Sequence, residues 1–312
     1  MRLHVAVTDS DWFALHASKS EVEEVNFWKP SDVSFKALQP GEILLFKLHA
    51  PDNYIVGGGF FTRFLHLPIN IVWETFGEAN GARSLTEMRE AIGRYRREII
   101  TASENPKIGC IMLAEPFFWD RSRWIEIPTD YPLNTPGRGY DSESGTGRAL
   151  WDAVSERLKQ SPAIRLEPDT ATVAAIKSQG FGKPQIVHPR LGQGLFRVLV
   201  TDAYSCRCAI TGERTLPVLE AAHIKPYSLV QRHYVSNGLL LRSDLHKLFD
   251  EGYLSVEPKQ KRLLVSKRIR EEFENGRDYY KLEGQVLREP TAVWARPLIE
   301  NLEYHATVRF RG

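Results

Sequence analysis

Apolar and polar residues alternate at the start of the chain and then gather into short apolar runs. The alternation over 3–7 predicts a strand, and the runs at 42–48, 54–61 and 108–113 predict three more. Over 84–100, apolar side chains recur at intervals near 3.6 residues behind a leading serine, which predicts a helix with a serine N-cap. Short strands mixed with a few helices favour a small mixed β-barrel in this part of the chain.

The composition changes after this region. The segment 130–147 is rich in Pro, Gly, Ser, Thr and Asp, which predicts a loop, whereas 148–160 has the apolar spacing of a helix. Prolines and glycines then gather again, as they do where one domain ends. We therefore expect an N-terminal domain over 1–165, a linker over 166–185 and a C-terminal domain over 186–312.

The overall composition is that of a folded protein. Of the 312 residues, 42% are hydrophobic and 26% are charged, which excludes bulk disorder. The formal net charge is only +2, but 186–312 has 20 Lys and Arg against 15 Asp and Glu, which favours a polyanionic partner. The sequence has neither an apolar run long enough for a membrane span nor a signal-peptide pattern at its start. We expect a cytoplasmic protein without a membrane span.

Three polar residues stand out in the C-terminal part of the chain. His223 ends an apolar, strand-like segment, and Asn237 lies 14 residues later, just before the apolar run 239–241. His246 follows after 9 more residues, on a short predicted helix that Ser243 can cap. This order of His, Asn and His, on a strand, a loop and a helix, is more specific than any one of the three residues.

The ordered set resembles the HNH nuclease motif, the ββα-metal fold, and the resemblance covers roughly 186–300. It implies a metal-dependent endonuclease that hydrolyses phosphodiester bonds. In that family the first histidine, here His223, is the general base that activates water, and the asparagine, here Asn237, pins the hairpin loop. The resemblance further implies that His246 binds one divalent metal, Mg²⁺ or Mn²⁺, that stabilises the leaving oxygen.

The remaining metal ligands are less clear from the sequence. Asp250 lies four residues after His246, so both share one helix face and Asp250 is a candidate second ligand. Many members of the family have Asp or His directly before the base, where this chain has Ala222. Glu220 lies two residues earlier and on a regular strand faces the same side as Ala222, which makes it a candidate replacement.

The cysteines argue against a second kind of metal site. Many HNH domains hold a structural zinc ion between two Cys-x-x-Cys pairs, but this chain has only Cys206 and Cys208 in that region. We therefore expect no structural four-Cys zinc and interpret both as reduced packing cysteines. A basic segment follows the motif, and beside a nuclease site its side chains are expected to contact the DNA backbone. The residues expected to do so are Lys259, Lys261, Arg262, Lys267 and Arg268.

The N-terminal part is rich in aromatic residues. The segment 26–30, Asn-Phe-Trp-Lys-Pro, falls between predicted elements, and the glycines of 57–61, Gly-Gly-Gly-Phe-Phe, predict a bulge or a close approach of the backbone, for example to a ligand. With the Val-Ala-Val-Thr start at 5–8, these segments resemble the EVE domains of the PUA superfamily. That resemblance implies a domain that flips out 5-methylcytosine or 5-hydroxymethylcytosine. The candidate pocket residues are Trp28, Asn26, Phe60 and Trp73.

The whole chain thus resembles an EVE–HNH endonuclease. The implied fold is α+β, with an N-terminal PUA-like (EVE) mixed β-barrel with helices and a C-terminal ββα-metal (HNH) nuclease domain. The implied substrate is double-stranded DNA with modified cytosine. Since one HNH site cuts one strand, a homodimer is expected. Two alternatives stay open: a nuclease whose N-terminal domain selects unmodified DNA or RNA, and a nucleic-acid-binding module with a degenerate nuclease site.

Overall fold

The computed structural model describes the chain except for residues 20, 32, 133, 160–191 and 231. The chain divides into two compact units, Met1–Arg190 and Leu191–Gly312, and each is described by itself. The expected linker over 166–185 lies outside the described residues, so the expected domain boundaries stay predictions. Within the described part, none of the helices combines the length and the apolar character that a membrane crossing needs.

The N-terminal unit is built on a seven-stranded mixed sheet in the order β2-β5-β4-β3-β1-β7, with β6 paired to β4. The strands are β1 (Arg2–Thr8), β2 (Glu24–Lys29), β3 (Ile43–Leu48), β4 (Tyr54–Pro68), β5 (Lys107–Phe118), β6 (Ile125–Glu126) and β7 (Gly137–Asp141). β1 runs parallel to β3, and the other pairs are antiparallel. The four predicted strands are confirmed, and so is the α+β class, whereas closure into a barrel stays a prediction.

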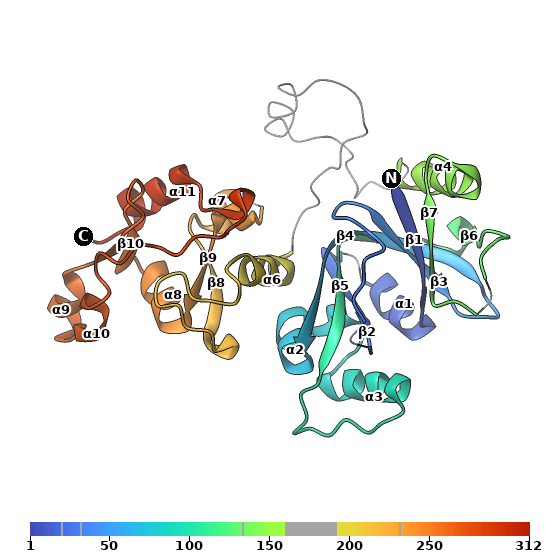
Figure 1. Cartoon of the computed structure of the whole chain (residues 1–312), viewed down its shortest axis with the longest axis horizontal. Helices are drawn as coiled ribbons and strands as arrows, with labels where there is room; N and C mark the ends of the chain where they lie inside the picture. The colour runs from blue at the N-terminus through green and yellow to red at the C-terminus, as the bar shows by residue number, and fades with distance from the viewer. Residues whose placement is uncertain (20, 32, 133, 160–191, 231) are drawn as a thin grey trace. The chain divides into compact units, whose positions relative to one another are not determined.

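Helices connect and cover these strands (Figure 1). They are α1 (Ser10–Ala17), α2 (Ile69–Phe76), the 3₁₀ turn η1 (Gly77–Asn80), α3 (Leu85–Arg96), the 3₁₀ turn η2 (Arg121–Arg123) and α4 (Gly145–Lys159). The predicted N-cap of α3 is confirmed, because the Ser84 hydroxyl accepts a hydrogen bond from the N–H of Glu87 at 3.1 Å. The loop predicted over 130–147 is wrong in part. It contains β7 and the start of α4, since 137–141 pairs along the edge of β1 despite its loop-like composition.

Two hydrophobic cores lie on opposite faces of the sheet. Successive residues of a strand point to opposite faces, so Ile43 and Leu45 of β3 pack with α4, while Leu44 and Phe46 pack with Trp12 of α1. All four β3 side chains are essentially inaccessible to solvent. A strand buried on both faces explains why 42–48 is a nearly continuous apolar run rather than an alternating one.

The glycine triplet in β4 brings two backbones together. A Cβ added to Gly57 would lie 2.2 Å from the carbonyl oxygen of Phe117, and one added to Gly58 would lie 2.7 Å from that of Leu44. Side chains at these positions would therefore push the neighbouring strands away. The predicted bulge is also confirmed, as the register with β5 shifts between Gly58 and Phe60. The close approach at these glycines is to the neighbouring strands β5 and β3.

The C-terminal unit is a hairpin enclosed by helices. Antiparallel strands β8 and β9 form the hairpin, α6 packs on both strands, and α8 follows β9 directly (Figure 1). The elements are α6 (Gln193–Ala203), η3 (Leu216–Val218), β8 (Leu219–His223), α7 (Tyr227–Val230), η4 (Val235–Asn237), β9 (Gly238–Arg242), α8 (Ser243–Asp250), β10 (Leu254–Val256), β11 (Leu263–Val265), α9 (Arg268–Phe273), α10 (Arg277–Tyr280), η5 (Val293–Ala295), α11 (Ile299–Tyr304) and the π-helical η6 (His305–Arg309).

One local prediction for this unit is wrong. Ser243 was expected to cap the helix that carries His246, but it is the first helical residue, and Arg242 occupies the N-cap position without a side-chain cap bond. The Arg242 guanidinium instead binds the carboxylate of Asp244 through two hydrogen bonds of 2.6 and 2.7 Å. The acidic side chain in the first turn also suits the positive end of the helix dipole.

Candidate active site

The hairpin loop is held closed by a buried asparagine. Asn237 is fully buried, its side-chain oxygen accepts a hydrogen bond from the N–H of Lys225 at 2.9 Å, and its side-chain amide donates to the Lys225 carbonyl at 2.8 Å. Its backbone carbonyl accepts a third bond, from the N–H of Ile224, at 2.9 Å. The residue after Asn237, Gly238, pairs with His223 across the hairpin. Asn237 therefore fixes the backbone directly after His223.

His223 lies at the end of β8 with its ring on the floor of the site. The imidazole is half-buried and stacks on Phe196 of α6, with ring centroids 4.1 Å apart and planes 9° apart. Burial, and then the charge of His233, lowers the pKa of His223 to about 4. The ring is therefore neutral at pH 7 and has a lone pair that can accept a proton.

A second histidine, His233, touches the first. The Nε2 atom of His223 lies 2.9 Å from the Nδ1 atom of His233. The motif-based argument missed this residue. The only sequence signal was one more histidine between His223 and His246, in a loop whose spacing matches no part of the motif. The contact depends on how the loop folds back over the hairpin, and spacing alone does not fix that.

The three expected metal ligands lie together on β8 and α8. The Nδ1 atom of His246 is 2.6 Å from a carboxylate oxygen of Glu220, and its Nε2 atom is 3.2 Å from one of Asp250. Burial lowers the pKa of His246, but hydrogen bonds to Asp250 and Glu220 and their negative charges outweigh it, so the pKa is raised. Ala222, which occupies the usual ligand position, is fully buried.

These side chains fit a hard divalent cation by donor type. One imidazole and two carboxylates are donors that Mg²⁺ and Mn²⁺ accept. The imidazole lies between the two carboxylates, with one ring nitrogen facing each. In this arrangement, no three His, Cys, Asp or Glu side chains of the described residues are placed to hold a metal ion together. The two carboxylates and His246 are thus the right groups, joined to one another by hydrogen bonds.

The predicted DNA-backbone residues differ in their surroundings. Lys261 forms an ion pair with Glu289, and Arg268 forms one with Glu272 at 2.7 Å. The Arg262 guanidinium donates a hydrogen bond to the carbonyl of Gly284 at 2.8 Å. Lys259 and Lys267 are exposed on either side of β11. Contact of all five with phosphates stays a prediction, and for the paired residues it competes with the acids they already bind.

Two of the predicted base-pocket residues meet at one turn of the N-terminal unit. Asn26 and Trp28 lie on β2, not between elements as predicted, because Val25 and Phe27 alternate with them and pack into the sheet core. The side-chain amide of Asn26 donates to the side chain of Asn80 at 2.8 Å, and the Trp28 indole donates to the Asn80 carbonyl at 3.0 Å.

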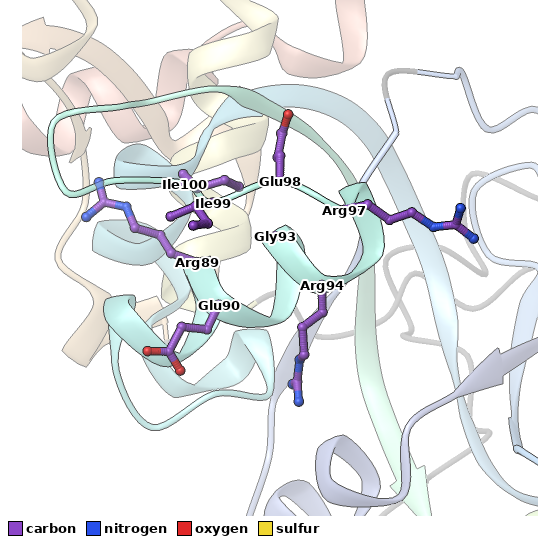
Figure 2. Close-up of a pocket in the computed structure, with 8 residues that line it drawn as sticks. All are labelled: Arg89, Glu90, Gly93, Arg94, Arg97, Glu98, Ile99 and Ile100. Atoms are coloured by element: carbon purple, nitrogen blue, oxygen red, sulfur yellow. The ribbon is translucent and has the colours of Figure 1, made fainter.

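The other two candidates lie elsewhere. Phe60 of β4 packs in the core that α4 covers and meets Phe117 edge to face, with centroids 6.4 Å apart. Trp73 is half-buried on α2. A recess of about 510 Å³ lies at the C-terminal end of α3, and none of the four candidates lines it (Figure 2). Its lining residues are Arg89, Glu90, Gly93, Arg94, Arg97, Glu98, Ile99 and Ile100.

The comparisons with known proteins support the C-terminal site. No curated protein matches the chain in sequence. Three solved structures are similar in part. ASCH from Zymomonas mobilis is 11% identical over 48% of this chain and 94% of that chain, with a TM-score of 0.34. A point mutant of that protein is 10% identical over 48% and 96%, with a TM-score of 0.33. The modification-dependent TagI restriction endonuclease is 10% identical over 96% and 79%, with a TM-score of 0.27.

TM-scores this low carry no argument about either unit. The family model described as HNH endonuclease matches residues 208–257, the segment that holds Glu220, His223, Asn237, His246 and Asp250. The match covers the hairpin β8–β9, α8 and the start of the strand that follows. The C-terminal unit therefore contains an HNH endonuclease domain.

Proposed function

We propose that the protein is a modification-dependent DNA endonuclease. Its C-terminal domain hydrolyses phosphodiester bonds, and its N-terminal domain selects DNA in which a cytosine is 5-methylated or 5-hydroxymethylated. One observation carries the nuclease part of the proposal: a neutral, half-buried His223 sits on a hairpin that Asn237 closes, inside the segment matched by the HNH endonuclease model.

His223 acts as the general base. It takes a proton from a water molecule as that water's oxygen forms a bond to the scissile phosphorus and the bond to the leaving oxygen breaks. A base must be unprotonated before the reaction, and burial keeps this ring in that state at neutral pH. The stack on Phe196 restricts the ring to one plane, which holds the accepting nitrogen in a fixed direction.

Asn237 positions this base without touching the substrate. Its two side-chain bonds to Lys225 fix the loop two residues beyond His223. Because Asn237 is fully buried, both bonds form away from competing water. This is the role that the HNH resemblance implies for the asparagine.

Glu220, His246 and Asp250 would hold the divalent cation. When bound, the cation supplies charge stabilisation at the scissile phosphate and the leaving oxygen. The residues themselves gather negative charge at one point of the site and keep His246 within reach of both carboxylates. His246 must give up its proton before it can bind a metal, and its raised pKa means that this proton is held more tightly than usual.

The selection of modified cytosine rests on the resemblance to EVE domains and on the place of Asn26 and Trp28. A flipped cytosine needs an aromatic face to stack on and a polar partner for its pairing edge. Trp28 supplies a half-buried indole on the same strand and the same side as a polar amide, that of Asn26. Since one HNH site cuts one strand, we propose that a homodimer makes the double-strand cut.

Matched plasmids test the function directly. Three plasmids of the same sequence, with cytosine, 5-methylcytosine or 5-hydroxymethylcytosine, are incubated with the protein in Mg²⁺ or Mn²⁺, with His223→Ala as the inactive control. The proposal expects cleavage of the modified plasmids only. Equal cleavage of all three would indicate a nuclease that selects unmodified DNA as well. Binding without cleavage in either metal would indicate a binding module with a degenerate site.

A further inference from the structure

The nuclease site contains a histidine to which the HNH motif gives no role. His233 lies in the loop between α7 and η4, and its Nδ1 atom is 2.9 Å from the Nε2 atom of His223. The three motif residues of the chain are accounted for by base, loop and metal, so His233 is additional to them. Its distance to the base is that of a full hydrogen bond.

Aromatic rings hold this pair on both sides. Phe196 stacks on His223 with centroids 4.1 Å apart and also lies 5.3 Å from the His233 ring. Tyr227 of α7 stacks on His233 with centroids 4.3 Å apart and planes 18° apart. Three elements, α6, α7 and the loop, thus place the two imidazoles in a fixed relation. A chance surface contact would not be clamped between rings in this way.

Hydrogen bonding between two neutral imidazoles has a strict consequence. One ring must donate and the other must accept, so a single proton lies between Nε2 of His223 and Nδ1 of His233. The tautomer of one ring therefore sets the tautomer of the other. Which nitrogen of the base has a free lone pair is then decided by His233 and not by His223 alone.

We propose that His233 is a positioning residue of the nuclease site, which orients the general base His223 and fixes its tautomer through their shared hydrogen bond. The inference rests on the proposed function, because it assigns His223 as the base. His233 acts through His223 and needs no contact with the substrate. Its contribution belongs to the chemical step and not to DNA affinity.

The charges around the base make the effect measurable. A positive charge on His233 disfavours one on His223, and the charge of His246 on α8 acts in the same direction. The carboxylate of Asp250, also on α8, acts in the opposite direction, and Tyr227 faces the pair from α7. Removing His233 thus takes away one influence that keeps His223 unprotonated, whereas the α8 residues are unchanged.

Two substitutions separate the hydrogen bond from the charge. His233→Ala removes both. His233→Asn places its side-chain amide near the position of Nδ1, so that it keeps the hydrogen bond but not the ability to be charged. Tyr234→Phe, on the exposed neighbouring ring, is the control and should behave as the wild type. Single-turnover cleavage of a modified duplex from pH 5 to pH 9 and duplex affinity are measured for each, with thermal melting as the test of folding.

We expect His233→Ala to lower the cleavage rate by as much as ~10²-fold, the loss typical of a misplaced reacting group, with duplex affinity unchanged. His233→Asn should recover most of the rate, while the acidic limb of the pH profile moves to higher pH in both variants. Wild-type rates and pH profile in His233→Ala would overturn the proposal. Equal losses of rate, affinity and melting temperature in both variants would also overturn it, because they would show a purely structural role.

A second measurement does not depend on cleavage. ¹⁵N NMR of the imidazoles in the full chain, in EDTA and without DNA, reports the tautomer and the pKa of His223 directly. The proposal expects His223 to change tautomer population and to gain a higher pKa in His233→Ala. If no duplex is cleaved but this coupling is present, the proposed function fails and the pairing of the histidines stands. If His223 titrates identically with and without His233, the pairing itself is wrong.

Discussion

Asn237 binds both the N–H and the carbonyl of Lys225, at 2.9 and 2.8 Å, across the loop that follows the catalytic strand. An amide is needed for this, since only one side-chain end accepts and the other donates. Asn237→Ala leaves two backbone groups unpaired in a buried setting, and we expect it to destabilise the C-terminal unit by about 1–3 kcal/mol. Cleavage should fall as well, because the base loses its support. Urea unfolding and single-turnover cleavage measure the two effects.

Asn237→Asp refines that test. Aspartate has nearly the same shape but accepts at both oxygens, so the bond to the Lys225 carbonyl becomes a repulsion between oxygens. We expect the loss to equal or exceed that of the alanine variant, whereas Ser236→Ala on the same turn should cost less than about 0.5 kcal/mol. A fully active and stable Asn237→Asp would mean that the loop is closed by other contacts.

Removal of the base separates chemistry from binding. We expect His223→Ala to lower the cleavage rate by about 10²–10⁴-fold, the usual contribution of a general base, while affinity for modified duplex stays nearly intact. Affinity should come from the basic side chains and the N-terminal domain, neither of which involves this ring. Filter binding alongside cleavage decides it. Cleavage at the wild-type rate would sink the assignment of His223.

The metal ligands are tested one at a time. His246→Ala should abolish cleavage by loss of metal binding, and Asp250→Ala and Glu220→Ala should each weaken the binding of Mn²⁺ measured by calorimetry. Each carboxylate lies within 3.2 Å of His246, so both are placed to share a cation with it. If calorimetry gives the wild-type affinity for both carboxylate variants, the ligand set proposed here is incorrect. Circular dichroism checks that α8 persists in each variant.

Much of the C-terminal site could be predicted because its residues have fixed relations along the chain. The four-residue spacing of His246 and Asp250 places both on one helix face, and the two-residue offset of Glu220 from Ala222 selects the strand face. Both relations are local, and the structure contains them. The contact of His233 with His223 is not local. It depends on the fold of an irregular loop, for which no periodicity exists.

The N-terminal unit shows where local patterns fail. Polar neighbours made the segment around Asn26 look like a connection, but Val25 and Phe27 alternate with polar positions and form β2. The segment around Gly139 looked like a loop but pairs with β1, because an open sheet edge supplies hydrogen bonds that composition does not reveal. Phe60 was grouped with Trp28, although sheet order and register place its ring in the core that α4 covers.

The selection of modified cytosine is tested at Trp28. Stacking acts only on a flipped base, whereas phosphate contacts act on any duplex, so Trp28→Ala should lower binding of modified duplex by about 1–3 kcal/mol, roughly 5–150-fold. Binding of unmodified duplex at low salt should barely change. The indole also donates to the Asn80 carbonyl, so some loss of stability is expected, and Trp28→Phe keeps an aromatic face as the matched variant.

The two Trp28 variants together distinguish a pocket from a core. If the ring stacks on the base, Trp28→Phe recovers most of the preference for modified duplex even though it lacks the indole N–H. If the ring is only core, both variants melt earlier and lose all binding in parallel. A stable Trp28→Ala variant that still prefers modified duplex would move the pocket elsewhere, towards Phe60 or Trp73.

A buried histidine behind α8 predicts how acid affects the C-terminal unit. His305 is only 2% exposed, stacks on Phe249 at 3.7 Å, and binds the Ser255 hydroxyl at 2.9 Å and the Phe249 carbonyl at 3.1 Å. Burial lowers its pKa from 6.5 to about 4. Between these two values the unfolded chain binds a proton that the folded chain does not, so the stability due to neutral His305 is complete above pH 6.5 and declines as the pH falls towards 4.

The expected slope is up to about 1.4 kcal/mol per pH unit for this one proton, and His305→Gln should remove that part of the slope between pH 6.5 and 4. Other buried histidines contribute similar slopes, so the difference between the variant and the wild type is the quantity to measure. Urea unfolding followed at Trp294, the tryptophan of the C-terminal unit, with a ¹⁹F label gives that difference at each pH. Since Phe249 directly precedes Asp250 on α8, cleavage by the wild type should fall with this loss of stability below pH 5. Parallel stability curves for the two proteins would show that His305 is protonated equally in the folded and unfolded states.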